Sequence, residues 1–343
     1  MTSSERFLVT GALGCVGAWT VRRLVAEGVE VFAYDLATKP HRLRLVMDDD
    51  QMRKVHAVHG DITSMESFER AVVDHGITHV VHLAALQIPF VKADPIQGAR
   101  VNVVGTTIVF ETARAHSSQV RGVSYASSAG VYGAAEMYPP GPLAHDAPLL
   151  PPSLYGVFKQ AAEGAAKIFW QDHQLRSVGL RPYVVYGPGR DQGMTSTPTK
   201  AMLAAALGRP YHITYGGSVV FQHADDAASA FIAAARSEVG GAPVYNLGGS
   251  HASMERVVGA IESAAPGAKG RITFEPNPLP MPSDIDPSEF HAFLPEVTWR
   301  PLERGIAETV EHFRSAHRAG LVDADRILGD QAAPAEAAQL PDL

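Results

Sequence analysis

Three glycines at short, regular spacing follow the first apolar run of the chain. The run Phe7–Val9 leads into the segment TGALGCVG, in which glycines stand at positions 11, 14 and 17. A glycine at 11 permits a tight turn, one at 14 lets another group approach the backbone, and one at 17 lets a helix pack closely on a strand. The segment therefore predicts a strand, a tight turn and a helix over residues 14–27, the opening unit of a doubly wound α/β sheet.

The rest of the N-terminal half repeats this alternation of apolar runs and helical patterns. Further strands are predicted over residues 29–34, 55–58, 80–83, 120–125 and 175–185, and helices over 64–74, 95–115 and 153–173. Short connections between alternating strands and helices favour a parallel sheet covered by helices on both faces. We predict a Rossmann fold of this kind.

The pattern changes after residue 185. A loop rich in glycine, proline and hydroxyl side chains precedes a helix over 199–207, and residues 219–248 read as strand, helix and strand that return to the sheet. Two helices and a strand surround a proline-rich loop within 251–320. We predict a Rossmann domain from 1–185 plus 219–250, a smaller C-terminal substrate lobe from 186–218 plus 251–330, and a disordered tail over 331–343.

Composition excludes several classes of function. The net charge of −7 argues against binding to nucleic acid or to an anionic membrane surface. The single cysteine excludes an internal disulfide and suits a reducing cytoplasm, where we expect the protein to reside. The apolar run Ala227–Ala235 is far shorter than the roughly 20 residues of a membrane span. His56 and His59 face opposite sides of a predicted strand, so we expect no metal site.

The glycine segment and two carboxylates predict a dinucleotide site. The N–H groups and positive dipole at the start of the helix can hold a pyrophosphate. Asp35, 18 residues after Gly17, ends the second strand, where a carboxylate accepts hydrogen bonds from the adenosine ribose and repels a 2′-phosphate. This favours NAD over NADP. Asp61, after the third strand, is placed either near the adenine amino group or as a cap of the helix that begins near Thr63.

Tyr155 and Lys159 indicate hydride-transfer chemistry. They lie one helical turn apart, so the ammonium can stabilise a phenolate that removes a proton from a secondary alcohol. Ser128 can donate a hydrogen bond to the substrate oxygen as it becomes a carbonyl. The Gly-x-Ser-x-Gly motif of hydrolases is absent from the sequence.

With these motifs in order, the chain resembles the extended short-chain dehydrogenase/reductase superfamily, and within it the NAD-dependent epimerase/dehydratase family. The resemblance covers residues 6 to about 320. It rests on TGALGCVG, Asp35, GDI, His82-Leu-Ala-Ala, Asn102-Val-Val-Gly-Thr, SSAGVYG, YGVFK, LRPYVVYGPG and FQHADD.

The resemblance and the expected sheet edge define the predicted site residues. The catalytic set is Ser128, Tyr155 and Lys159. The NAD-binding set is Gly11, Gly14, Cys15, Val16, Gly17, Asp35, Leu36, Asp61, Ile62, Leu83, Ala84, Ala85, Asn102, Ala126, Ser127, Tyr155 and Lys159. The substrate set, at the carboxyl ends of the strands, is Gln87, Ser128, Tyr155, Arg190, Thr195 and His223. The helices over 95–115 and 153–173 are expected to pair in a homodimer, as in similar proteins.

Departures from the family pattern bear on the substrate. Val184 and Val219 stand where nucleotide-sugar members usually carry the Asn and Arg that hold the diphosphate. A valine supplies neither a hydrogen bond nor a charge, so we expect UDP- or TDP-sugars to bind weakly. Ala129-Gly130 replaces the Asp-Glu pair of dehydratases, which argues against 4,6-dehydration. Asp225 and Asp226 of the FQHADD segment are expected to cap the following helix.

The sequence thus leads to one hypothesis with two alternatives. The leading hypothesis is an NAD-dependent oxidoreductase or epimerase that acts on a secondary hydroxyl of a sugar or sugar-derived compound without a nucleotide. The first alternative is a nucleotide-sugar 4-epimerase. The second is a non-catalytic protein that senses NAD, against which the intact set of Ser128, Tyr155 and Lys159 argues.

Asp35 generates the first prediction. We expect NAD to bind much more tightly than NADP, because the Asp35 carboxylate and a 2′-phosphate carry like charge. Fluorescence titration of both cofactors measures the preference, and the variant Asp35→Ser should lose it. Equal affinities in the unaltered protein would contradict the assignment.

Overall fold

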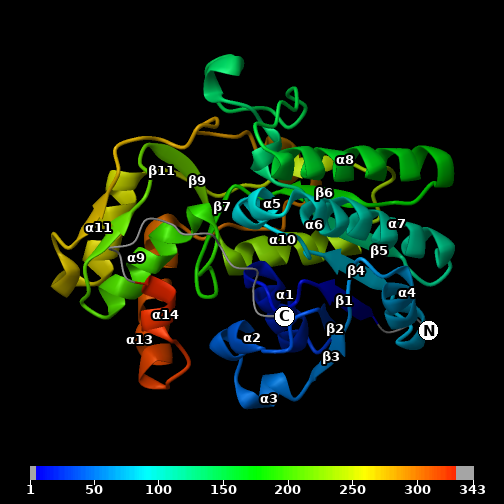
Figure 1. Cartoon of the computed structure of the whole chain (residues 1–343), viewed down its shortest axis with the longest axis horizontal. Coiled ribbons are helices and arrows are strands. Elements are labelled where there is room, and N and C mark those ends of the chain that lie inside the picture. Colours follow the sequence, from blue (N-terminus) through cyan, green and yellow to red (C-terminus); the bar gives the residue numbers. More distant parts are fainter. Residues whose placement is uncertain (1–4, 330–343) are drawn as a thin grey trace.

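A seven-stranded parallel sheet forms the centre of the molecule (Figure 1). The computed structural model describes residues 5–329, so the tail predicted over 331–343 lies outside the described part. The strand order is β10-β6-β5-β4-β1-β2-β3. The strands are β1 (Arg6–Thr10), β2 (Glu30–Asp35), β3 (Val55–His59), β4 (His79–His82), β5 (Gly122–Ala126), β6 (Val178–Arg181) and β10 (Val244–Asn246). This order confirms the predicted doubly wound fold.

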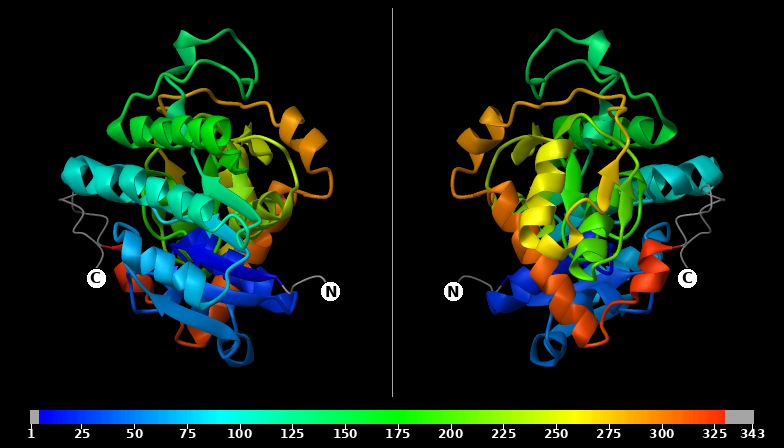
Figure 2. Two further views of the ribbon diagram at one scale, coloured as in Figure 1. Left: turned by 90° about the vertical axis from the view of Figure 1, so that its right-hand side faces the viewer. Right: turned by 90° about the vertical axis from the view of Figure 1, so that its left-hand side faces the viewer.

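Helices cover both faces of this sheet because the side chains of its strands alternate between two apolar cores. On β1, Phe7 and Val9 point into one core and Leu8 into the other. The first core receives α1 (Cys15–Ala26) and α10 (Ala224–Arg236), which pack on each other. The second receives α4 (Met65–Asp74), α7 (Gly105–Ala115) and α8 (Leu154–His173), and α7 and α8 lie side by side (Figure 2). No helix within residues 5–329 is long and apolar enough to cross a membrane.

Some local elements differ from the predicted ones. The helix expected over 95–115 consists of α6 (Pro95–Ala99), one π-helical segment, η1 (Arg100–Val104), and α7, and it follows a short α5 (Ile88–Ala93). Two further helices, α2 (His41–Val46) and α3 (Asp49–Met52), lie between β2 and β3 and were not predicted. Short amphipathic turns of this length carry too little periodic pattern to be recognised.

Two small sheets and a group of helices lie beside the main sheet, and we call them the second lobe; the predicted domain bounds stay a prediction. A three-stranded sheet has the order β11-β9-β7, and a parallel pair joins β8 and β12. These strands are β7 (Val184–Tyr186), β8 (Tyr211–Ile213), β9 (Ser218–His223), β11 (Ser250–Ser253) and β12 (Ile272–Phe274). The helices are α9 (Thr197–Ala206), α11 (Met254–Ala264), α12 (Ser288–Phe293), α13 (Leu302–Arg318) and α14 (Ala324–Leu328).

Two strand predictions are corrected here. The single strand expected over 175–185 is divided into β6 of the main sheet and β7 of the small sheet, with Pro182 at the break. Proline has no N–H group for a strand ladder, which explains the break at this position. Of the segment 219–248, only β10 returns to the main sheet, because β9 pairs with β7 and β11.

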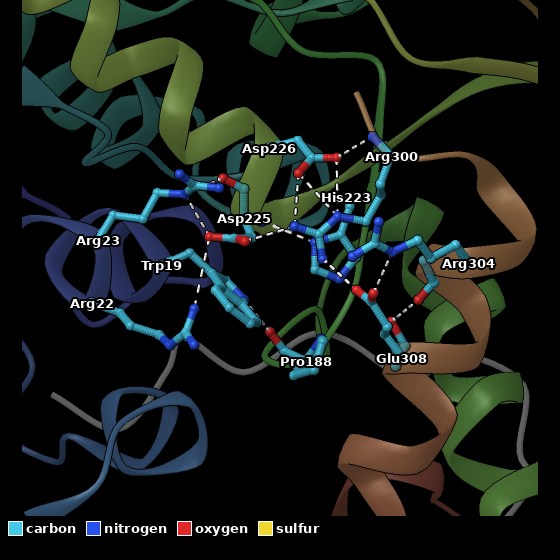
Figure 3. A network of polar contacts seen from close by, with 12 residues as sticks. Trp19, Arg22, Arg23, Pro188, His223, Asp225, Asp226, Arg300, Arg304 and Glu308 are labelled. Atoms are coloured by element: carbon cyan, nitrogen blue, oxygen red, sulfur yellow. Dashed lines mark hydrogen bonds and ion pairs between the residues drawn. The ribbon is translucent and has the colours of Figure 1, made fainter. Parts of the chain in front are cut away.

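An ion-pair network joins the second lobe to the Rossmann helices (Figure 3). Arg300, just before α13, contacts Asp225 at 2.6 Å and Asp226 at 2.8 Å, and Arg23 of α1 contacts Asp225 at 2.6 Å. The expected capping role of the two aspartates is wrong. His223 is the N-cap of α10, since its Nδ1 accepts the Asp225 N–H at 3.1 Å. The carboxylates instead lie in the first turn, where the helix dipole stabilises negative charge.

A second, fully enclosed ion pair ties α8 to the main sheet. Arg181, at the end of β6, donates from Nε and Nη2 to the two carboxylate oxygens of Glu163 on α8, at 2.8 and 2.6 Å. The side chains are only 5% and 7% exposed. Arg181 also donates to the Tyr132 hydroxyl at 2.6 Å, and Ser127 donates to Glu163. These additional hydrogen bonds help to offset the cost of burying two charges.

This pair generates a stability prediction. Glu163→Gln should lower the free energy of unfolding by about 3–5 kcal/mol, because it leaves the Arg181 guanidinium buried without a counter-charge. The double variant Glu163→Gln/Arg181→Met should lose much less than the sum of the two single losses. Urea unfolding of all four proteins measures this coupling. Strict additivity would show that the two charges do not stabilise each other.

Candidate active site

The glycine segment forms a close-packed turn between β1 and α1. Gly11 has φ +64°, and a Cβ atom there would lie 2.7 Å from the backbone nitrogen of Ala84. A Cβ atom on Gly17 would lie 2.1 Å from the Gly11 carbonyl oxygen. Gly14 is the N-cap of α1 and supplies no side chain to cap it. The N–H groups at the start of this helix are therefore not capped by a side chain of Gly14 and can donate to a phosphate.

Asp35 lies beside this turn and is tied to it. Its two carboxylate oxygens accept the N–H groups of Leu13 and Ala37, each at 2.9 Å. Burial raises the pKa of Asp35, and these backbone N–H groups oppose that rise. Each oxygen keeps a lone pair for a further donor such as a ribose hydroxyl. The charge of Arg42 also opposes the rise in the pKa of Asp35. Arg42 Nη2 donates to the Asp191 carboxylate at 2.7 Å.

Asp61 follows β3 at the same edge. It does not cap α4, because Ser64 is the N-cap and accepts the Ser67 N–H at 3.2 Å. Asp61 Oδ1 instead accepts both the N–H and the hydroxyl of Thr63 at 2.8 Å. Its placement near the adenine stays a prediction, as do the cofactor contacts of Leu36 and Ile62, which follow the ends of β2 and β3.

A buried chain of hydrogen bonds fixes the segment Leu83–Ala85 next to the glycine turn. The Thr10 hydroxyl accepts the N–H groups of Leu83 and Ala84, each at 3.2 Å, and lies 2.7 Å from Nδ1 of His82. Nε2 of His82 lies 3.0 Å from the Thr106 hydroxyl, which itself donates to a carbonyl oxygen. Burial lowers the pKa of His82 to about 3, so the ring is neutral and acts as a structural bridge.

Asn102 and Ser127 act on neighbouring chain segments. The Asn102 amide accepts the N–H of Leu86 at 2.7 Å and donates to its carbonyl oxygen at 2.9 Å, so it shapes the loop that carries Gln87. Ser127 is 2% exposed and its hydroxyl donates to Glu163. These contacts explain why both polar side chains can be buried. Their direct contact with NAD stays a prediction.

The predicted catalytic residues meet at the carboxyl end of β5. Tyr155 and Lys159 lie on the first turns of α8, whose N-cap Ser153 accepts the Gly156 N–H at 3.2 Å. Lys159 Nζ lies 5.8 Å from the centre of the Tyr155 ring and donates to the Ala126 carbonyl oxygen at 2.6 Å. The Ser128 hydroxyl accepts the N–H of Gly130 at 3.0 Å, and it lies beside the Tyr155 phenol. The structure therefore brings the three together.

Burial dominates the ionisation of these groups. It raises the pKa of Tyr155, and the nearby Ser128 hydroxyl opposes this rise. It lowers the pKa of Lys159 to about 8, and the charge of Glu163 opposes this fall. Glu163 lies one turn after Lys159 on the same helix. Sequence analysis did not single it out, although the i+4 spacing from Lys159 was a signal for it.

The predicted substrate residues fall into two groups. Gln87, Arg190 and Thr195 lie together, since a Cβ atom on Gly193 would be 2.0 Å from Gln87 Oε1 and 3.3 Å from Arg190 Nη2, and Nη2 donates to Thr195 at 3.0 Å. His223 is 3% exposed and packs edge-on against the rings of Trp19 and Tyr186. Burial lowers its pKa to about 3. Its packing and capping roles account for it without a substrate contact.

The loop after β7 covers the start of α1. Trp19 Nε1 donates to the Pro188 carbonyl oxygen at 2.9 Å, and Cys15 Sγ lies 4.0 Å from the same oxygen (Figure 3 shows Trp19 and Pro188). This contact of residues far apart in sequence joins the loop of Arg190 to the glycine turn. Residues 5–329 contain no group of three or more His, Cys, Asp or Glu side chains that could hold a metal ion.

Comparison with known proteins agrees with this geometry. Residues 7–248 match the family model described as the NAD dependent epimerase/dehydratase family. The chain is 33% identical over 328 residues to UDP-glucose 4-epimerase of Mycolicibacterium smegmatis, covering 90% of this chain and 99% of the relative. The solved UDP-glucose 4-epimerase of Thermus thermophilus with NAD is 28% identical with a TM-score of 0.74, covering 91% of this chain and 100% of that one. MoeE5 in complex with UDP-glucuronic acid and NAD is 27% identical with a TM-score of 0.72, at the same coverage.

The fold and site are those of an extended short-chain dehydrogenase/reductase that uses NAD. The chain belongs to the NAD-dependent epimerase/dehydratase family, which confirms the resemblance drawn from its motifs. The residues fit this cofactor. The glycines at 11 and 17 leave no room for side chains, the start of α1 can hold the pyrophosphate, and the Asp35 carboxylate lies beside them.

Two substitutions test the catalytic roles. Tyr155→Phe should keep NAD affinity within a few-fold yet lower turnover by about two to four orders of magnitude, the range for a general acid–base group. Lys159→Met should reduce both, because we expect the same ammonium to contact the nicotinamide ribose and to stabilise the phenolate. Fluorescence titration gives the affinity, and turnover is followed with a sugar that the unaltered enzyme converts. Near-normal turnover of Tyr155→Phe would exclude its role in proton transfer.

Proposed function

We propose that this protein is an NAD-dependent epimerase that inverts a secondary hydroxyl centre of a nucleotide-linked hexose. The observation that carries the proposal is the meeting of Ser128, Tyr155 and Lys159 at the strand edge beside the glycine turn. The similarity to a UDP-glucose 4-epimerase over nearly the full length of both chains supports it. The comparisons therefore favour the alternative derived from the sequence over the leading hypothesis of a substrate without a nucleotide.

Tyr155 is the proposed acid–base residue. Its phenolate takes the proton from the sugar hydroxyl, and the resulting phenol returns it when the carbonyl is reduced again. The ammonium of Lys159 stabilises the phenolate, and it is held in place by the Ala126 carbonyl. Ser128 donates a hydrogen bond to the reacting oxygen, which acquires negative charge in the transition state. NAD, held at the glycine turn and Asp35, would supply the hydride chemistry of both half-reactions.

Inversion requires that the cofactor stay bound between the two half-reactions. The loop after β7 supports such retention, because Pro188 and Gly189 lie against the first turn of α1. Arg42 strengthens the same region by joining the Leu13 carbonyl oxygen at 3.1 Å to Asp191 at 2.7 Å. Residues of the second lobe thus cover the turn that would hold the pyrophosphate.

One observation favours a second candidate, a dehydrogenase or epimerase of a sugar that carries no nucleotide. Val184 and Val219 are 1% and 2% exposed and belong to the apolar core of β7 and β9. They offer no donor or cation for a diphosphate. Each lost charged hydrogen bond weakens binding by about 1.5–3 kcal/mol.

We also propose that the protein forms a homodimer through α6, η1 and α8. Large apolar side chains are exposed along these helices, among them Ile96, Val104, Leu154, Val157 and Ile168. Ile96 is 69% exposed, which is unusual for a monomer surface when several such side chains lie on neighbouring helices. Light scattering should give twice the chain mass of 36.6 kDa, and Val157→Glu should reduce it to one chain. A monomeric unaltered protein would refute the interface.

UDP and UDP-glucose test the proposed function. We expect NAD-loaded protein to convert UDP-glucose into its 4-epimer with no net accumulation of NADH, and calorimetry to detect micromolar UDP binding. Product stereochemistry is determined by NMR, with Tyr155→Phe as the inactive control. Millimolar UDP affinity together with NADH formation from a free sugar or sugar acid would overturn the proposal in favour of the second candidate.

A further inference from the structure

Arg190 is a cation without a counter-charge inside the candidate site. Its only hydrogen bond from the guanidinium within residues 5–329 runs from Nη2 to the Thr195 hydroxyl at 3.0 Å. Its Nε atom is buried and has no partner within the same residues. The neighbouring carboxylate cannot serve, because Asp191 already contacts Arg42 at 2.7 Å, with Arg326 and His41 at 3.7 and 3.9 Å. A buried donor without a hydrogen-bond partner lowers the stability of the folded protein unless a ligand accepts the hydrogen bond.

An unpartnered acceptor lies next to this donor. Gln87 Oε1 is also buried without a hydrogen bond in the described part of the chain. It comes from the loop after β4, whereas Arg190 comes from the loop after β7, and both face Gly193. The absence of a side chain at Gly193 is required, because a Cβ atom would overlap Gln87 Oε1 at 2.0 Å. The two loops thus converge on one small polar region with one charged donor and one neutral acceptor.

The position of this region relates it to the reacting carbon. The charge of Arg190 acts on Tyr155, opposing the rise in pKa that burial causes. It acts also on Cys15 at the start of α1, where burial raises the pKa of the thiol to about 11 and Arg190 is the first of the opposing charges. Gly189, the residue before Arg190, lies beside the start of α1, since a Cβ atom on it would be 3.8 Å from the Cα atom of Cys15.

We propose that Arg190 and Gln87 recognise a carboxylate and a non-reacting hydroxyl on the sugar, so that the substrate is a hexuronic acid derivative. The inference rests on the proposed function, because it takes a nucleotide-linked sugar as the substrate. A carboxylate pairs with the fork of a guanidinium, and a hydroxyl other than the reacting one donates to the Gln87 oxygen. A pyrophosphate has no donor and leaves Gln87 Oε1 unsatisfied. Val184 and Val219 are apolar and cannot bind an anion, so we assign the selection of the substrate to Arg190.

A matched pair of ligands tests the inference. UDP-glucuronate and UDP-glucose differ only in a carboxylate or a hydroxymethyl group at C6. Binding is measured by calorimetry on NAD-loaded Tyr155→Phe protein, in which turnover is blocked. We expect UDP-glucuronate to bind about 10- to 100-fold more tightly, the range for one charge-assisted hydrogen bond. Adding Arg190→Met should abolish this difference while UDP-glucose affinity changes by only a few-fold.

Further variants separate the role of Arg190 from a general effect on the protein. Arg190→Lys keeps the charge but loses the fork, and it should retain part of the preference. Arg70→Met removes an exposed arginine on α4 and should leave both affinities unchanged. If Arg190→Met fails to fold, Arg190→Lys alone still tests the inference through the size of the preference.

Three outcomes would overturn the inference. They are equal affinity for the two sugars in the parent protein, equal loss of both in Arg190→Met, and a loss of NAD affinity as large as the loss of UDP-glucuronate affinity, which would place a cofactor phosphate on Arg190. Free glucuronate and glucose form a separate arm. Binding of glucuronate that depends on Arg190, without binding of UDP, would refute the nucleotide-linked substrate and support the carboxylate site.

Discussion

The buried ion pair between Glu163 and Arg181 connects the two parts of the proposed catalytic machinery. Glu163 lies on the helix that carries Tyr155 and Lys159, and Arg181 ends the strand next to the one that leads into Ser127 and Ser128. The bidentate geometry fixes the rotation of α8 relative to the sheet, and the Ser127 hydroxyl adds a third contact. Because the ammonium of Lys159 is one turn from this carboxylate, the same interaction supports the charged form of the lysine.

The buried charges of the molecule differ in whether they are paired with an opposite charge. Most buried charges are paired, as Asp225 and Asp226 are with Arg23 and Arg300. Lys159 and Arg190 are different, since their hydrogen bonds go to a neutral carbonyl and a neutral hydroxyl. Two cations with neutral partners at one strand edge favour anionic species there, namely a phenolate, a cofactor phosphate or an acidic substrate.

The family relationship and the local substitutions give different information about the substrate. Similarity along the whole chain supports a nucleotide-linked sugar, because a relative with that substrate aligns from end to end. Val184 and Val219 show that the diphosphate, if present, is not held by side chains at these two strand positions. We then expect the sugar to add binding energy of its own, and the unpartnered groups of Gln87 and Arg190 are its proposed contacts.

Features that depend on local geometry could be predicted from the sequence. The glycine turn followed from conformations that only glycine adopts, and the approach of Tyr155 to Lys159 followed from the pitch of a helix. The parallel sheet could be predicted because segments with the apolar pattern of a strand alternate with segments that have the pattern of a helix. Each pattern indicates which side of that segment is buried. These are properties of short segments, which carry their own physical signature.

Features that depend on contacts between distant segments were decided only by the tertiary structure. Asp191 follows Arg190 directly, yet it pairs with Arg42, 149 residues away, and so leaves Arg190 uncompensated. His223 was placed in the substrate set from the sequence, but it packs against Trp19 of α1 and against Tyr186, which β7 brings beside β9. Periodicity reports whether a side chain is buried but not which partner buries it. The order of the strands in space selects that partner, and with it the charge of the site.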